Sequence, residues 1–393
     1  MLLLAGLIAA AWYWWPAPPH KPQPPRKTSP PPPAVVQLPA VPSSAPKSPP
    51  TNPPPAPPAP RLVVQTNLPP PALPAPRPAA QTNLPPPVPP APGPRLQTNA
   101  PAAQPGAFPR PVRDVLEAQL ALARQGISSG SLDGLIGPQT RAAIRAFQQK
   151  ENLPTTGELD PATKELLLLD APPLTTYTVT TNDLSRLQPI SPTWLGKSQQ
   201  SALDYETLLE LVAEKGHSHP NLIRRLNPSL DWSNVTEGAA VRLPDVAYSN
   251  GGAKAAFATI SLSGKVLEAF DPSTNLLAHF PCSIAQRVEK RPIGELHVAV
   301  IAPNPNYTFD PDVFPESAEA RELKRKLILP PGPNNPVGVA WIGLDKPGYG
   351  IHGTPSPEQV GRTESHGCFR LANWNAECLV RLVWVGMPVY VEP

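Results

Sequence analysis

Proline is concentrated in the first third of this 393-residue chain, and this distribution most restricts what the chain can fold into. Of its 64 prolines, 38 lie before residue 112. Because proline fixes φ and lacks a backbone N–H, residues 16–111 should favour extended polyproline II over helix or sheet. The segment also repeats Gln-Thr-Asn with a period of sixteen, at Gln65, Gln81 and Gln97. We interpret it as a disordered spacer that reaches roughly 300 Å at most, so the folded domains should lie in residues 112–393.

Charge is divided along the same boundary. Nine Lys and Arg and no acidic residue precede Asp114, whereas the remainder carries 24 Lys and Arg against 30 Asp and Glu. The net charge of +3 is therefore the average of a basic tail and a mildly acidic folded part. The basic residues are dispersed among prolines without interleaved aromatic residues, which argues against nucleic-acid binding. Such a tail suits anionic wall polymers or lipid head groups.

Residues 1–15 are apolar and end in an aromatic cluster at 12–15. At ~1.5 Å per residue they span about 22 Å, short of a ~30 Å hydrocarbon core. The positively charged start of a signal peptide is also absent. Two interpretations stay open: a signal anchor whose aromatic residues lie at the membrane interface, or a signal peptide whose true start lies upstream. We favour the uncleaved anchor, which would tether the protein to the inner membrane.

Three cysteines occur, and an odd, low number argues against a disulfide framework. Cys378 has helical spacing to Leu379 and Leu382, and Cys282 follows a predicted strand, so we expect both to be buried; a disulfide between them is the disfavoured alternative. Cys368 has a different setting, between a glycine and an aromatic residue and sixteen positions after His352.

That setting predicts nucleophilic catalysis. A thiol titrates near pH 8.5, so only a few per cent is thiolate at neutral pH. A histidine within hydrogen-bond reach raises that fraction and later returns the proton to a leaving amine. Cys368 and His352 therefore provide the parts for acyl transfer at an amide bond. The sequence contains no metal-ligand motif, phosphate loop or nucleotide fingerprint, and we expect no cofactor; a zinc site at His217 and His219 is disfavoured.

The surrounding motifs resemble a known family. His352-Gly353-Thr354 is followed by Ser365-His366-Gly367-Cys368-Phe369-Arg370 and Asn373. Together with the segments at 292–295, 329–336 and 341–352, these residues resemble the YkuD-type catalytic domain of bacterial L,D-transpeptidases over residues 255–393. One departure is Asn375, where the family often has an aspartate, a position expected to help hold the loop.

The resemblance implies a role for each motif residue. Cys368 is the nucleophile, His352 is the general base, and the backbone carbonyl of Gly353 replaces the acid of a triad by fixing the histidine tautomer. The oxyanion hole is expected from backbone N–H groups around Cys368, where a glycine allows close approach. The remaining assignments are Gly367 in the oxyanion hole and His366 either supporting the oxyanion or packing. Ser365 is expected to bond backbone in preference to reacting, Arg370 either to bind a substrate carboxylate or to brace the loop, and Asn373 to fix the turn. Trp341 is expected in the core in preference to the cleft wall.

The resemblance also implies the reaction. Cys368 would attack the diaminopimelate–D-Ala bond of a tetrapeptide stem and transfer the acyl group to an amine of another stem, as a 3→3 cross-link, or to a lipoprotein. Alternatives are an L,D-carboxypeptidase or endopeptidase, and a catalytically silent wall-binding scaffold. The expected partners are peptidoglycan stem peptides and glycan, in the periplasm or elsewhere in the cell envelope.

Residues 112–170 predict a three-helix unit. Apolar spacing from Val115 predicts the first helix, residues 138–147 the second, and the Asp160-Pro161 pair opens a third through Leu168. The segments at 132–141, 146–149 and 156–160 resemble a peptidoglycan-binding domain. That resemblance implies docking on glycan or stem peptide; the alternative is a spacer that keeps the fold without affinity.

Residues 174–247 predict a small α+β module with the order strand, helix, helix, strand. Its ends at 221–227 and 238–244 resemble a LysM carbohydrate-binding module. An insertion of some twenty residues, including Pro192, Trp194 and Gly196, separates the first strand from the helices and puts the glycan groove in doubt.

Residues 255–393 predict a mostly-β domain, similar to a β-sandwich with one short helix near 375–385. The chain as a whole is thus predicted to be multidomain. Residues 303–335 are rich in Pro and Asn, and a loop of that length inside a domain usually serves function, so we interpret it as a lid or substrate wall. The predicted strands are 257–262 and 265–270, which form a hairpin, then 296–301, 337–344, 349–353 and 388–391.

Overall fold

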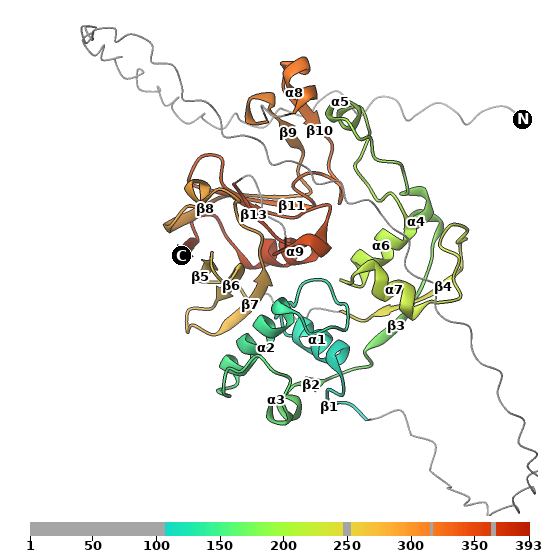
Figure 1. Cartoon of the computed structure of the whole chain (residues 1–393), viewed down its shortest axis with the longest axis vertical. Helices are drawn as coiled ribbons and strands as arrows, with labels where there is room; N and C mark the ends of the chain where they lie inside the picture. The colour runs from blue at the N-terminus through green and yellow to red at the C-terminus, as the bar shows by residue number, and fades with distance from the viewer. Residues whose placement is uncertain (1–106, 247–252, 315–316, 363–366) are drawn as a thin grey trace, which may run out of the picture. The chain divides into compact units, whose positions relative to one another are not determined.

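The computed structural model describes residues 107–246, 253–314, 317–362 and 367–393 (Figure 1). The predicted anchor and nearly all of the predicted linker lie outside these ranges. Within them, no helix combines the length and the apolar character needed to cross a bilayer.

The first folded part is a small helical unit, as the sequence predicts. The side chain of Asp114 accepts a hydrogen bond from the N–H of Glu117 at the start of the first helix, and Asp160 caps the third helix through the N–H of Thr163. The third helix ends earlier than predicted because Leu168 belongs to a short strand that pairs with the start of the unit. The elements are β1 (Arg110–Pro111), α1 (Val115–Arg124), α2 (Pro138–Lys150), α3 (Pro161–Leu166) and β2 (Leu168–Leu169).

The middle module has the predicted strand at each end, and the two strands pair antiparallel. The first strand ends at Thr178, because Thr180 caps a short helix in a reciprocal capping box with Asp183. The inserted residues contain a further short helix. The elements are β3 (Leu174–Thr178), α4 (Thr181–Ser185), α5 (Trp194–Ser198), α6 (Leu208–Lys215), α7 (Pro220–Leu226) and β4 (Ala240–Pro244).

Eight strands of the C-terminal part form one continuous ladder in the order β13-β12-β11-β8-β14-β5-β6-β7. The predicted hairpin is present, with Ser261 opposite Val266. The last strand, β14, pairs in parallel with β5 and antiparallel with β8, so the end of the chain lies in the middle of the sheet. The strands are β5 (Phe257–Ser261), β6 (Val266–Phe270), β7 (Leu276–Pro281), β8 (Gly294–Pro303), β11 (Ala340–Leu344), β12 (Gly350–His352), β13 (Phe369–Arg370) and β14 (Pro388–Glu392). β7 is the strand expected before Cys282, and β13 was not predicted.

One helix, α9 (Asn373–Leu382), packs on this sheet, beginning two residues before and ending three residues before the predicted bounds. Its fully buried Ala376 and Leu379 share a hydrophobic core with Ile342 and Phe369 of the strands. Cys282 and Cys378 are both buried in the same core, and none of the three cysteines is in a disulfide. Burial of these two cysteines is therefore confirmed, and the disfavoured disulfide does not form.

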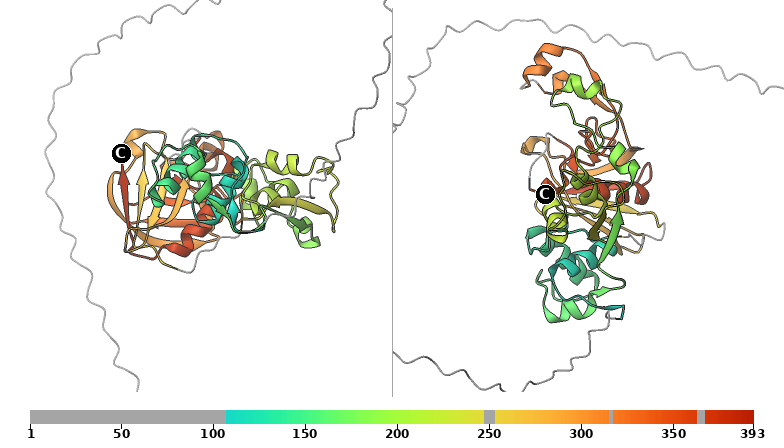
Figure 2. Two further views of the ribbon diagram at one scale, coloured as in Figure 1. Left: turned by 90° about the horizontal axis from the view of Figure 1, so that it is seen from below. Right: turned by 90° about the vertical axis from the view of Figure 1, so that its right-hand side faces the viewer.

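The predicted long loop, residues 303–335, has secondary structure of its own. β9 (Tyr307–Phe309) pairs antiparallel with β10 (Leu327–Leu329), and α8 (Ala318–Leu323) lies between them in the sequence. Figure 1 shows these elements beside α5 of the middle module, and the right-hand view of Figure 2 agrees. Three short 3-10 turns complete the domain: η1 (Val288–Lys290), η2 (Pro311–Val313) and η3 (Pro357–Gln359).

The three folded parts contact one another directly. The N–H of Ser128 donates to the carbonyl of His279 on β7 over 2.8 Å, and the Ser128 hydroxyl accepts from the Asn375 amide over 3.1 Å. The N–H of Leu132 donates to the carbonyl of His217, whose ring stacks on Trp374 with a centroid separation of 5.1 Å. Asn375 is therefore a buried contact with the helical unit as well as a part of α9.

Candidate functional site

The candidate catalytic residues come from two neighbouring strands. β12 and β13 pair in parallel, with His352 opposite Arg370 and Ile351 opposite Phe369. Successive side chains of a strand point to opposite faces. Ile351 and Phe369 lie in the core, each 1% exposed, so His352 and Arg370 point to the other face. Cys368, one residue before Phe369, is expected on that same face.

The His352 ring is buried, and its tautomer is fixed. Its Nδ1 lies 2.6 Å from the carbonyl oxygen of Gly353. A carbonyl only accepts, so Nδ1 donates, and Nε2 is left unprotonated to accept a proton. Burial, with a smaller contribution from the charge of Arg370, lowers the pKa of His352 to about 4 despite that hydrogen bond. The ring is therefore neutral at physiological pH.

Cys368 is half-buried, and its Sγ lies 3.5 Å from the carbonyl oxygen of Gly348. Burial raises the pKa of its thiol above the ordinary value, and a backbone hydrogen bond with Gly350 and the charge of Arg370 oppose this only in part. The resting pair at neutral pH is accordingly a thiol and a neutral imidazole, and no thiolate–imidazolium pair is formed. A proton must then leave the thiol as attack begins.

These ionisation states predict the pH dependence of the reaction. We expect the acid limb of kcat/KM near pH 4, because His352 stays neutral down to that pH. We expect alkylation of Cys368 by iodoacetamide to rise only in alkaline solution, because its thiol pKa is raised. Mass spectrometry of the alkylated cysteine as a function of pH, beside the pH–rate profile, measures both. An acid limb near pH 6.5, or an alkylation plateau between pH 5 and 8, would contradict the assignment.

Trp341 lies over the histidine, contrary to its predicted place in the core. It stands opposite His352 in the β11–β12 pairing, it is only half-buried, and the two rings stack with centroids 5.7 Å apart. Gly350 makes room for it, since a Cβ at that position would lie 2.5 Å from the indole. The indole ring thus forms a wall of the site and restricts the rotation of the His352 imidazole.

Asn373 holds the segment that follows the histidine. It is 1% exposed, and its Oδ1 accepts from the N–H of Thr354 over 2.9 Å and from that of Val339 over 3.4 Å. Its Nδ2 donates to the carbonyl of Pro333 over 3.3 Å. A Cβ on Gly353 would lie 2.2 Å from that Oδ1, so the packing requires glycine there. These contacts suit the predicted role of Asn373 in fixing the turn.

Glu214 of α6 links the middle module to this asparagine. It hydrogen-bonds Asn373, and burial, with the nearby carboxylates of Glu210, Glu377 and Glu358, raises its pKa from 4.5 to about 8. The folded protein therefore holds a proton between these pH values that the unfolded chain releases. The resulting contribution to stability is fully present below about pH 4.5 and is lost as the pH rises through about 8.

Replacing Glu214 by glutamine should test this linkage. The amide mimics the neutral acid, so we expect Glu214→Gln to melt close to the wild type near pH 5. At pH 8.5 the variant should be more stable by roughly 1–3 kcal/mol. Thermal unfolding of both proteins across this range is the measurement. A constant difference between the two melting curves would show that Glu214 is ionised throughout.

Two of the predicted site residues, Ser365 and His366, lie outside the described residues. Gly367 is described and half-buried, and among the described residues no heavy atom lies within 4 Å of where its Cβ would stand. That the N–H groups of Gly367 and Cys368 donate to the oxyanion is still a prediction.

Arg370 is fixed through its backbone, and its side chain remains near the thiol. Its N–H and carbonyl pair with Ser283 over 3.0 and 2.9 Å. Burial lowers its pKa, whereas Cys368 and Tyr307 raise it. The guanidinium thus remains a cation beside the nucleophile.

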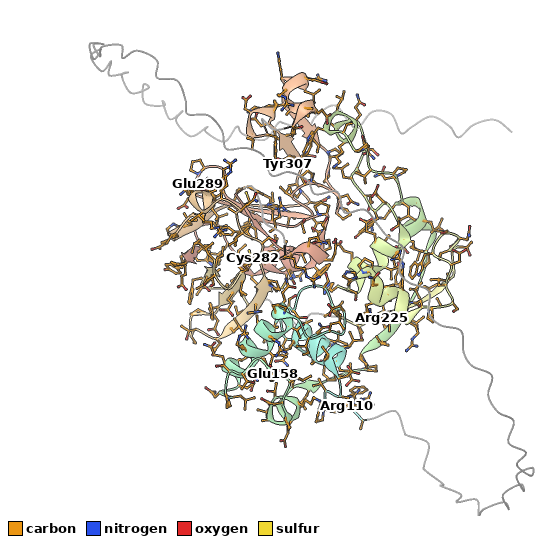
Figure 3. All side chains as sticks on the ribbon, viewed as in Figure 1. Arg110, Glu158, Arg225, Cys282, Glu289 and Tyr307 are labelled. Atoms are coloured by element: carbon orange, nitrogen blue, oxygen red, sulfur yellow. The ribbon has the colours of Figure 1, made fainter. Side chains whose placement is uncertain are left out.

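Tyr307 is a site residue that the sequence did not identify. It lies on β9 of the lid (Figure 3), and burial together with the Cys368 charge raises its pKa to about 12. The interaction places its hydroxyl in the electrostatic neighbourhood of Cys368 and Arg370. The sequence offered only a weak signal, two aromatic residues at positions 307 and 309, because residues two positions apart on a strand point to the same face.

Comparisons with known proteins agree with this domain organisation. A family model described as “L,D-transpeptidase catalytic domain” (YkuD) matches residues 255–391, and one described as “Putative peptidoglycan binding domain” matches residues 112–167. “Putative L,D-transpeptidase YkuD” of Bacillus licheniformis is 24% identical over 185 residues, which are 47% of this chain and 93% of that protein. “Putative L,D-transpeptidase YqjB” of Bacillus subtilis is 36% identical over 105 residues, which are 25% of this chain and 51% of that protein.

Among solved structures, “L,D-transpeptidase from Mycobacterium smegmatis” is 19% identical, covering 42% of this chain and 80% of that chain with a TM-score of 0.28. The family assignment rests on the two matched sequence models. The chain therefore carries a YkuD-type L,D-transpeptidase catalytic domain preceded by a peptidoglycan-binding domain, and it is an enzyme of the L,D-transpeptidase kind.

Proposed function

We propose that the protein cross-links peptidoglycan stems through a thioester on Cys368. The observation that carries this proposal is the buried, neutral His352, whose donation to Gly353 leaves Nε2 ready to accept a proton. The strand register puts His352 and Arg370 on one face, where Cys368 is also expected. Such a base, held in one tautomer by a backbone carbonyl, needs no carboxylate partner.

In the first half-reaction, the Cys368 sulfur attacks the diaminopimelate carbonyl of a tetrapeptide stem. The thiol proton passes to Nε2 of His352, the S–C bond forms, and the carbonyl oxygen becomes an oxyanion that the N–H groups of Gly367 and Cys368, with His366, would stabilise. Collapse breaks the C–N bond, and His352 gives the proton to the departing D-Ala amine. One carbon–nitrogen bond is thus replaced by one carbon–sulfur bond.

In the second half-reaction, an amine of another stem or of a lipoprotein attacks the thioester. His352 accepts the amine proton and returns it to the cysteine sulfur as the new amide forms. Water in place of the amine would make the enzyme an L,D-carboxypeptidase. The half-buried Trp341 and the lid restrict access of water to this step.

The other parts are proposed to hold the enzyme on its polymer. The helical unit would dock on peptidoglycan, and the middle module, whose paired strands enclose helices, would contribute a LysM-like contact with glycan. The apolar segment 1–15 would tether the chain to the inner membrane in the periplasm, with the proline-rich segment as spacer. Maintenance of cell shape would follow from cross-linking.

Product analysis tests the proposed reaction. The full chain, beside Cys368→Ala, is incubated with disaccharide-tetrapeptide, and the products are identified by mass spectrometry. Cross-linked dimers that lack one D-Ala, absent with the variant, are the expected result. Tripeptide alone would identify a carboxypeptidase, cleavage of supplied dimers an endopeptidase, and no product from any substrate a scaffold.

A further inference from the structure

The insertion in the middle module, residues 188–203, packs against the lid of the catalytic domain. The Trp194 ring of α5 stacks on Phe309 of β9 with centroids 4.4 Å apart and lies 6.4 Å from the ring of Tyr307. Glu319 of α8 accepts the N–H groups of both Trp194 and Leu195 over 2.8 Å. An acidic side chain of the lid thus fixes the start of α5.

Backbone hydrogen bonds join the same two segments further on. The N–H of Leu203 donates to the carbonyl of Pro331 over 2.9 Å, and the N–H of Asn334 donates to the carbonyl of Leu203 over 2.9 Å. Gly332 permits this approach, because a Cβ there would lie 2.1 Å from the Leu203 carbonyl oxygen. Leu203 and Phe309 are both fully buried in one small core. The lid and the insertion are therefore a single packed unit formed by two domains.

This unit forms one wall of a cleft of about 430 Å³. Trp194 and Lys197 line it from the insertion, and Thr354 and Arg370 line it from the catalytic strands. The Lys197 ammonium lies 5.5 Å from the centroid of the Trp194 ring, a cation–π contact that restrains it. Among the described residues that line the cleft, none is acidic. Two cations from different domains therefore share it.

We propose that the insertion completes the substrate cleft, and that Lys197, together with Arg370, binds a carboxylate of the stem peptide while Trp194 supports the apolar part of that stem. This inference rests on the proposed function, since it names how the same site recognises its peptide. A tetrapeptide stem offers two carboxylates near the scissile bond, on the diaminopimelate side chain and on the terminal D-Ala. Either suits an ammonium and a guanidinium that line the same cleft.

Kinetics with neutralised substrates test the proposal on the full chain. We expect Lys197→Gln to lower kcat/KM for the tetrapeptide about tenfold, chiefly through KM, because a charge-assisted contact is lost. Lys197→Arg should recover most of the activity. Two modified tetrapeptides are compared. In one, the side-chain carboxylate of diaminopimelate is replaced by a carboxamide; in the other, the terminal carboxylate of D-Ala is replaced. When the amidated carboxylate is the one that Lys197 binds, wild type and Lys197→Gln should have equal kcat/KM. The substrate that gives this equality therefore identifies the bound carboxylate.

Lys324→Gln, on an exposed lysine of the lid outside the cleft, is the matched control and should leave KM unchanged. An unchanged KM in Lys197→Gln would overturn the inference. An equal loss with both amidated substrates would also overturn it, because the effect would then not depend on the carboxylate. A wild type that makes no product would instead refute the proposed function, so the two failures are distinguishable.

Discussion

Replacing Cys368 by alanine is expected to lower transpeptidation by ~10⁴-fold or more. The thioester cannot form without the sulfur, and no other described cysteine can substitute, because Cys282 and Cys378 are fully buried. The half-buried thiol contributes little to the core, so the variant should fold normally. The rate of formation of cross-linked dimers, quantified by chromatography, measures the effect. An unchanged melting temperature would show that the lost activity is due to the missing thiol and not to unfolding.

The two buried cysteines supply matched controls. Cys282→Ala and Cys378→Ala each remove a sulfur from the core and should cost about 1–2 kcal/mol of stability. Neither should change the rate per folded molecule. If either control abolished activity in a folded protein while Cys368→Ala kept it, the assignment of the nucleophile would be wrong.

Replacing His352 by alanine is expected to lower kcat/KM by ~10²–10⁴-fold. The thiol pKa is raised by burial, so without a base to accept its proton little reactive thiolate is present at neutral pH. The residual rate should then increase with pH, as the thiol ionises by itself. Steady-state rates between pH 6 and 10 measure this change of profile.

His297→Gln is the matched histidine control. That ring is exposed, pairs with Asp345 over 3.0 Å, and lies on β8 away from β12. Its replacement should leave the rate and the pH profile unchanged. A His352→Ala enzyme with the wild-type rate and profile would show that another group activates the thiol.

The sequence was sufficient to predict one contact at the candidate site, that of His352 with the backbone of Gly353. Cys368, His352 and Gly353 belong to short motifs, and the predicted contact from the histidine to the Gly353 carbonyl is present in the structure. A bond between adjacent residues depends on local conformation, which a motif encodes. The catalytic roles of these residues stay predictions.

Short elements escaped prediction for a physical reason. β13 consists of Phe369 and Arg370 alone, and β9 and β10 of three residues each, which is too short for an alternating pattern to be visible. Their strand geometry comes from pairing with partners distant in the sequence. Tyr307 and the true position of Trp341 were missed for the same cause, since only the register places them at the site.

The contact between domains was also beyond the sequence. The insertion that separates the strands of the middle module looked like a departure from a LysM pattern. In the structure it packs on the lid through Trp194 and Leu203. Packing between segments more than a hundred residues apart leaves no periodic signal in either one.

The most direct test of the account is the identification of the acyl-enzyme. The full chain is mixed briefly with tetrapeptide stem in the absence of acceptor, quenched in acid, and mapped by peptide mass spectrometry. The account predicts a thioester on the peptide that contains Cys368, with the mass of the stem less its terminal D-Ala, and loss of the adduct when an acceptor amine is added. Product formation with no adduct on Cys368, or with an adduct on a different residue, would contradict it.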